Sequence, residues 1–298
     1  MNALQALATV LLIGAAPADG ADLVLDGREG AFVDAVINGV TFRLKVEFDL
    51  LPGVTLNPDA AARAALGPGE GRWTERIGPI TLRGRSSDDV PLILAGAPAE
   101  VSVRWRDGPA VMAADGAVSV HSLPFDSVTI NRAQPQARER EISFVTRLHD
   151  NHGVHFRLPI GRRRIAVRFS LSRPRTTAPA AAAAIIAEQQ GGVLGNESSV
   201  EEIAPGVERP VRPLRLGRAL AFGGLSVPLL MVRTADFRGQ HQLAWAQEPT
   251  SDGQIVVTGS RASQEALYRI TLGLDVLGRC SSATYRRSTG ELRLRCAI

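Results

Sequence analysis

Lysine, cysteine and aromatic residues are scarce in this 298-residue chain. Lys45 is the only lysine among 34 basic residues, so the basic side chains are almost all arginine. The arginines are scattered, and no stripe of interleaved aromatic side chains accompanies the net charge of +4. This pattern indicates a bias of genome composition and argues against nucleic acid as a partner.

Three common functional motifs are also missing. The sequence contains no Gly-rich phosphate loop, no Gly-x-Ser-x-Gly elbow and no Cys-x-x-Cys pair, and nothing else in it points to a cofactor. What is present is ordinary for a globular chain, with 45% hydrophobic and 21% charged residues. This composition argues against disorder of the whole chain.

Residues 1–21 hold an apolar run that ends in small residues. Such a run is typical of a secretory signal peptide and is too short to span a membrane. Because no Lys or Arg precedes it, a buried N-terminal helix is the alternative interpretation. No other run approaches membrane length, so we expect no stable membrane span and an exported chain, periplasmic or secreted.

The two cysteines, Cys280 and Cys296, lie symmetrically about the turn-forming sequence Ser288-Thr289-Gly290. A hairpin closed at this turn would put them side by side. In an exported protein this arrangement predicts a cross-strand disulfide. In a cytoplasmic protein the same pair would be two small buried thiols.

Two similar segments lie 121 residues apart. In the first, a strand ending at Asp49 leads through a turn into an Ala-rich helix that begins near Pro58. In the second, a strand followed by Ser170 leads into an Ala-rich helix after Pro179. The matching pairs are Phe48/Phe169, Thr55/Thr176 and Pro58/Pro179. A repeat of this size predicts two similar lobes, because solenoid repeats are much shorter.

Alternating apolar residues around both segments predict an all-β fold with short helices. Hairpins are expected at Asn38-Gly39 and at Ile160-Gly161-Arg162. We assign residues 22–133 to an N-terminal lobe, residues 134–147 to a charged linker and residues 148–298 to a C-terminal lobe. The growing offset between matching strands predicts loop insertions in the C-terminal lobe, at residues 191–211 and 247–264.

The order of these elements carries a resemblance to a known family. The chain resembles the two-lobed retropepsin-like and pepsin-like aspartic proteases in the order of its elements. That order is a strand ending in Asp, a turn, a helix, more strands and a closing Leu-Gly-Leu-Asp-Val-Leu element at residues 272–277. The resemblance covers nearly all of the chain after the leader. It implies two lobes facing a cleft, a peptide or protein substrate in that cleft, and a catalytic carboxylate at Asp49. It also makes Gly273 similar to the glycine that braces the catalytic loop, with Asp275 structural.

The catalytic motif departs from that family. Such enzymes hold one water between two carboxylates that share a proton, one from each lobe. The position matching Asp49 is Ser170, which cannot ionise, and the family's Asp-Thr/Ser-Gly is here Asp49-Leu50-Leu51. The counterpart of Gly273 is Ser119. Asp49 is therefore half of a dyad with a partner from elsewhere, a remnant in an inactive lobe, or an ordinary loop carboxylate.

Three functions remain open on this basis. The first is an exported aspartic peptidase homologue, a hydrolase if its diverged dyad is active. The second is a non-catalytic envelope module that binds a peptide or protein in the cleft. The third is a structural envelope protein whose cleft is closed by side chains such as Leu50 and Leu51. A second acid close to Asp49 would favour the first.

Two further sequence patterns each suggest a function and also have a plainer structural interpretation. His149, His152 and His155 have the spacing of a metal cluster, but Asn151 and Gly153 between them favour a solvated linker. Residues 254–261 resemble the short segment that opens the plug of TonB-dependent receptors. They are interpreted either as a strand that pairs with an envelope protein partner or as a strand inside an insertion.

Overall fold

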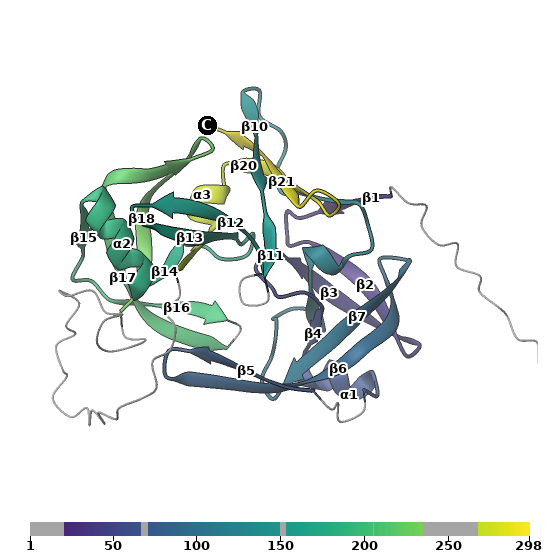
Figure 1. The fold of residues 1–298 in the computed structure, drawn as a ribbon. Helices are drawn as coiled ribbons and strands as arrows, with labels where there is room; N and C mark the ends of the chain where they lie inside the picture. Colours follow the sequence, from purple (N-terminus) through teal and green to yellow (C-terminus); the bar gives the residue numbers. More distant parts are fainter. Residues whose placement is uncertain (1–20, 67–70, 150–152, 205, 235–267) are drawn as a thin grey trace, which may run out of the picture.

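The computed structural model describes residues 21–66, 71–149, 153–204, 206–234 and 268–298 (Figure 1). The predicted leader up to residue 20 and the segment 254–261 lie outside this part of the chain. Strands dominate the described residues, and the helices α1 (Pro58–Arg63), α2 (Ala180–Gln190) and α3 (Leu274–Leu277) are short. The predicted all-β class with short helices is therefore confirmed.

A seven-stranded sheet is built from residues 32–119. Its spatial order is β2 (Phe32–Ile37), β3 (Val40–Glu47), β8 (Gly116–Ser119), β4 (Val54–Leu56), β7 (Ala97–Arg106), β6 (Ile80–Leu94) and β5 (Gly71–Ile77). Asn38 and Gly39 have φ angles of 50° and 80°, the left-handed conformations that a two-residue hairpin turn requires. The predicted hairpin between β2 and β3 is therefore confirmed.

A nine-stranded sheet is built from residues 147–272. Its order is β11 (Arg147–His149), β12 (Gly153–Ile160), β13 (Arg163–Phe169), β19 (Arg269–Leu272), β14 (Thr177–Pro179), β18 (Leu225–Arg233), β17 (Val207–Phe222) and β15 (Gly192–Leu194), with β16 (Ser199–Ala204) paired to β17. The hairpin predicted at Ile160-Gly161-Arg162 joins β12 to β13.

The two sheets share an order of pairing. β3 runs parallel to β8, as β13 does to β19. β4 is antiparallel to β8 and parallel to β7, and β14 has the same relation to β19 and β18. The loop after β3, which begins with Phe48 and Asp49, and the loop after β13, which begins at Ser170, therefore occupy corresponding places.

A five-stranded sheet joins distant parts of the chain, in the order β1 (Asp22–Asp26), β9 (Ser127–Asn131), β20 (Cys280–Arg286), β21 (Glu291–Ala297) and β10 (Glu139–Val145). The predicted disulfide between Cys280 and Cys296 is present, and the two cysteines are directly opposite in the β20–β21 hairpin. β10 lies inside the predicted linker. It forms a strand because β21 supplies its partner and Phe144 is buried.

Residues 191–211 also differ from the loop insertion that their composition predicts. They contain β15, β16 and the start of β17, which pair with one another. Local polarity misleads here because strand formation depends on β17, whose residues 214–216 pair with β15 and whose residues 207–211 pair with β16. Among the described residues, no helix has the length and apolar character needed to cross a membrane.

Candidate functional site

Asp49 lies in the loop that follows β3 and is only 9% exposed. The preceding Phe48 is buried in the main core, which fixes the end of the strand. The loop is held from the other side by the end of β8 and the residues that follow it. The amide of Gly53 donates to Ser122 Oγ at 2.7 Å, and the amide of Ser119 donates to Gly53 O at 3.2 Å. These bonds fix the loop backbone beside β8.

The loop that follows β13 is held in the corresponding way. The amide of Ser170 donates to Leu272 O at 2.9 Å, and the amide of Leu274 donates to Arg173 O at 2.8 Å. Ser170 itself is fully buried. A Cβ on Gly273 would lie 2.4 Å from the Arg175 carbonyl carbon, so this close approach requires glycine. The loop is therefore packed directly against the start of α3.

The two loops contact each other. Arg173 Nε donates to Asp49 Oδ2 at 3.0 Å, and Ser172 Oγ donates to Glu47 Oε2 at 3.1 Å. Ser170 Oγ lies 3.2 Å from Ser172 Oγ, which continues the network into the second loop. Ser170, which the internal repeat pairs with Asp49, therefore lies in the same hydrogen-bonded network as Asp49. The direct partner of Asp49, however, is an arginine.

Burial alone would raise the pKa of Asp49. The positive charges of Arg173 and Arg168, together with the hydrogen bond from Arg173, outweigh that effect and hold the pKa below its ordinary value. The neighbouring Glu47 shows the opposite shift. Its pKa is raised by burial and by the charge of Asp49, although Lys45 Nζ lies 2.6 Å from Glu47 Oε1 and opposes the rise. Two adjacent carboxyl groups thus have pKa values that are pushed apart.

Arg168 adds a second buried positive charge beside Asp49. Its Nη2 lies 3.9 Å from Asp49 Oδ2, and burial is the main effect that lowers its pKa. Within the described residues its Nε is buried without a hydrogen-bond partner. The carboxylate of Asp49 is therefore enclosed by cations, an environment that keeps it ionised and makes it a weak base.

Two hairpins, one from each large sheet, meet near this network. The hairpin cluster, as we call it, consists of buried side chains from β5 and from β16, β17 and β18, namely Ile77, Ile203, Val207, Val211 and Met231. Arg173 Nη1 also donates to the backbone oxygen of Glu202 in β16, at 3.3 Å. The loop that neutralises Asp49 is thus tied to the β16–β17 hairpin, which in turn packs on the β5–β6 hairpin.

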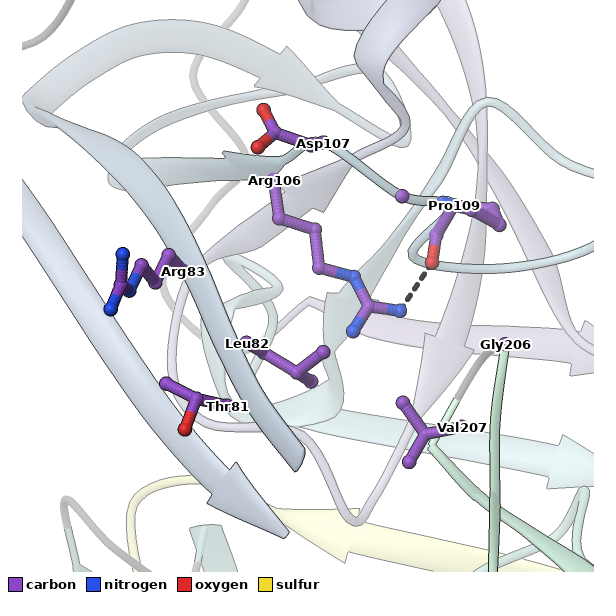
Figure 2. A pocket seen from close by; sticks show the side chains of 9 residues that line it. Thr81, Leu82, Arg83, Arg106, Asp107, Pro109, Gly206 and Val207 are labelled. Carbon is purple, nitrogen blue, oxygen red and sulfur yellow. Dashed lines mark hydrogen bonds between the residues drawn. The ribbon is translucent and has the colours of Figure 1, made fainter. Parts of the chain in front are cut away.

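A cavity of about 390 Å³ remains beside this contact (Figure 2). It is lined by residues of β6, by the segment after β7 and by the β16–β17 turn, namely Thr81, Leu82, Arg83, Arg106, Asp107, Gly108, Pro109, Gly206 and Val207. Figure 2 shows Arg106 reaching toward the carbonyl oxygen of Pro109, to which it donates a hydrogen bond. The cavity offers charged groups of both signs and apolar side chains from both large sheets.

Asp275 has the structural role that was expected of it. Thr176 Oγ1 donates to Asp275 Oδ1 at 2.7 Å and the Thr176 amide donates to Oδ2 at 2.9 Å. The amide of Gly273 then donates to Thr176 Oγ1 at 3.1 Å. Since Thr176 is fully buried, these bonds fix the end of the second loop to α3.

The Asp275→Ala substitution tests this role. We expect it to lower the free energy of unfolding by about 1.5–3 kcal/mol, because hydrogen bonds to a charged group are lost and a buried hydroxyl and amide lose their acceptor. Chemical denaturation of the two proteins measures the difference. Asp34→Ala, an exposed aspartate on β2, is the matched control and should change stability by less than about 0.5 kcal/mol. Equal losses in both variants would contradict the assignment.

The histidine pattern does not converge in the described residues. His155 lies in β12, is buried, and has its Nδ1 3.0 Å from Gly153 O. His149 ends β11, and His152 lies outside the described part. No group of three or more His, Cys, Asp or Glu side chains that could hold a metal occurs in residues whose placement is described.

The residues that sequence reasoning missed are Glu47, Arg168 and Arg173. A signal for the last was present, because Arg173 lies three positions after Ser170 and so belongs to the loop that should meet Asp49. A search for a charge opposite to Asp49 in that loop would have found it. Comparison of the sequence with protein-family models and with curated proteins gives no match.

Proposed function

We propose that this chain is an exported, non-catalytic homologue of the aspartic peptidases that binds an extended peptide or protein segment between its two lobes. The shared order and direction of strand pairing in the two large sheets supports a common origin of the lobes. The apolar leader and the Cys280–Cys296 disulfide support export to the periplasm or beyond. The cavity in Figure 2, lined from both large sheets, is the proposed binding site.

The observation that carries the proposal is the ion pair between Asp49 and Arg173. An aspartic dyad needs two carboxyl groups that share one proton, so that one acts as base and the other as acid. Arg173 instead occupies a hydrogen-bonding position on Asp49 Oδ2, and the second loop contributes Ser170 and Ser172. With a lowered pKa, Asp49 stays ionised and accepts a proton poorly.

One observation favours a second candidate, peptide hydrolysis with Glu47 as the second acid. The raised pKa of Glu47 and the lowered pKa of Asp49 are the kind of split that assigns an acid and a base. Glu47 ends β3 and Asp49 lies in the loop directly after it, however, so the lobes would not contribute one carboxylate each.

Cleavage of a random peptide library between pH 3 and pH 7, followed by mass spectrometry, decides between these functions. We expect the wild-type protein to cleave no more peptide than the Asp49→Asn variant does, because no pair of carboxyl groups is available to share a proton. The proposal is wrong if wild-type cleavage exceeds that of Asp49→Asn. Loss of that cleavage in Glu47→Gln as well would identify the second candidate.

Binding is tested with the same library under conditions without cleavage. Peptides retained by the immobilised wild-type protein should be retained at least about tenfold less well by Leu82→Trp, because the larger ring fills the cavity that we propose as the site. Met112→Trp, at an exposed side chain outside the cavity lining, is the control and should retain them as the wild type does. Equal retention by all three proteins would rule out this cavity as the binding site.

A further inference from the structure

A second hollow lies where the chain passes from β10 of the five-stranded sheet to β11 of the nine-stranded sheet. This groove has a volume of about 480 Å³ and is lined by residues of β10, β11, β12 and β13, namely Ser143, Phe144, Val145, Arg147, Phe156, Arg157, Pro159 and Arg164. Three of the eight lining residues are arginines and none is acidic. The groove is therefore positively charged.

These arginines have no charged partner within the described structure. Arg147, Arg157 and Arg164 are exposed, and no ion pair joins any of them to a described carboxylate. Glu141 on β10 and Glu291 on β21 are instead paired with Arg293. The positive charge of the groove is thus available to a ligand.

The arginines are arranged in a row by strand register. Arg147 is opposite His155, and Arg164 is opposite Pro159, with Arg157 midway between His155 and Pro159 on β12. Directly opposite residues and residues two apart share one face of a sheet. From one arginine to the next the row moves two residues along the strand direction, about 7 Å, and one strand sideways, about 4.8 Å, so it crosses β11, β12 and β13 diagonally.

Two strand edges beside this row are open. β11 pairs with β12 only as far as His155, so the edge of β12 from Phe156 to Ile160 has no neighbouring strand on that side in the described chain. β10 is the last strand of the five-stranded sheet. Unpaired backbone groups on an edge are a template for an added strand. An extended segment could therefore pair with either edge while its side chains lie along the groove.

We propose that this groove binds an extended acidic segment of another protein, which adds as a β-strand and has Asp or Glu at every second position. Side chains two apart on an extended strand point to the same face of a sheet, so a strand paired with this edge would present its carboxylates on the face that carries the arginines. Val145 is 79% exposed beside the row and offers an apolar contact to residues between the acids. This is the binding mode known as β-augmentation.

Single-stranded nucleic acid fits the groove less well. Binding of unpaired bases relies on exposed aromatic faces on which the bases stack. The two aromatic side chains here, Phe144 and Phe156, are buried and stack on each other with ring centroids 4.7 Å apart. They therefore leave no exposed aromatic face for a base.

The probe is a fluorescent nine-residue peptide with glutamate at every second position and valine or threonine between, titrated into the full chain at low salt. We expect saturable binding that weakens as salt rises. Each of Arg147→Gln, Arg157→Gln and Arg164→Gln should raise Kd about two- to fivefold, and the triple variant at least about tenfold. Arg72→Gln, an exposed arginine on β5, is the matched control and should leave Kd unchanged.

Two competing ligands make the inference falsifiable. A peptide of the same composition with its glutamates consecutive should bind at least about tenfold more weakly, because only every second glutamate of such a run would lie on the face of the arginines. Equal binding of both peptides, tighter binding of oligothymidylate, or unchanged Kd in the triple variant would each overturn the proposal. Leu82→Trp should leave this binding intact, which separates it from the function proposed for the cavity.

Discussion

The Arg173→Met variant is expected to be about 3–5 kcal/mol less stable to unfolding than the wild-type chain at neutral pH, since it leaves a buried charge without its main partner. Asp49 is 9% exposed, and Arg173 Nε is its hydrogen-bond donor at 3.0 Å. Arg168 remains near it, but only at 3.9 Å. Urea denaturation at pH 7 measures the loss.

The size of this loss should depend on pH in a defined direction. In the wild type the pKa of Asp49 is below its unfolded value, so the stability that it contributes is present above the unfolded pKa and is lost as the pH falls through the folded pKa. In Arg173→Met burial dominates and raises the pKa of Asp49. The difference between the two proteins should therefore be largest at neutral pH and should shrink on acidification below about pH 4.

Three control variants test whether the loss of stability comes from the unpaired charge of Asp49. Arg175→Met removes an arginine two positions away whose ion pair with Glu201 is half exposed, so it should lose less than about 1 kcal/mol. Arg173→Lys keeps the charge and should retain part of the stability. Asp49→Asn combined with Arg173→Met should recover most of the loss, because no buried charge is left. A double variant as unstable as Arg173→Met would contradict the ion-pair account.

Local sequence signals were sufficient to predict the elements that depend on neighbours in the chain. The Asn38-Gly39 turn, the helix entered at Pro58 and the Cys280–Cys296 hairpin all appear as expected. Each depends on residues that are close in sequence or symmetric about a turn, so a short pattern contains the whole signal. The position-by-position repeat also indicated which two loops should correspond.

The strands that the sequence did not predict depend on their pairing partners, whether near or far in the chain. The polar run from Glu139 to Glu141 predicts a charged linker, whereas β10 forms a strand there because it pairs with β21, about 150 residues away. The segment from residue 191 to 211 was Gly- and Pro-rich and forms strands because β17 pairs with both β15 and β16. No local pattern contains the contact that stabilises such strands.

The candidate site was likewise predictable from the sequence only in part. Asp49 and Ser170 were found because a repeat places them, whereas the effect of Arg173 on Asp49 depends on how the two loops pack. A carboxylate at the end of a strand has the same sequence pattern whether a second carboxylate or an arginine faces it. The chemistry of the site therefore follows from a contact between residues 124 positions apart, which composition and spacing do not specify.

The Ile77→Ala variant is expected to release the β5–β6 hairpin from the β16–β17 hairpin. Ile77 is 3% exposed and is the member of the hairpin cluster that comes from the first sheet, packed against Ile203, Val207, Val211 and Met231 of the second. Truncating a buried isoleucine removes about 2–5 kcal/mol of packing energy. Because the contact joins two hairpins and lies outside the main core, the loss should be local.

Amide hydrogen exchange measures this opening residue by residue. Amides of β5 should exchange at least about tenfold faster in Ile77→Ala, while amides of the main core keep their protection. Ile93→Ala, on β6 with 44% exposure, is the matched control and should leave β5 unchanged. If β5 exchanges at the wild-type rate in both variants, the cluster does not hold the hairpins together. If it opens as expected, this apolar contact holds the β5–β6 hairpin against the same β16 strand to whose backbone Arg173 is bonded.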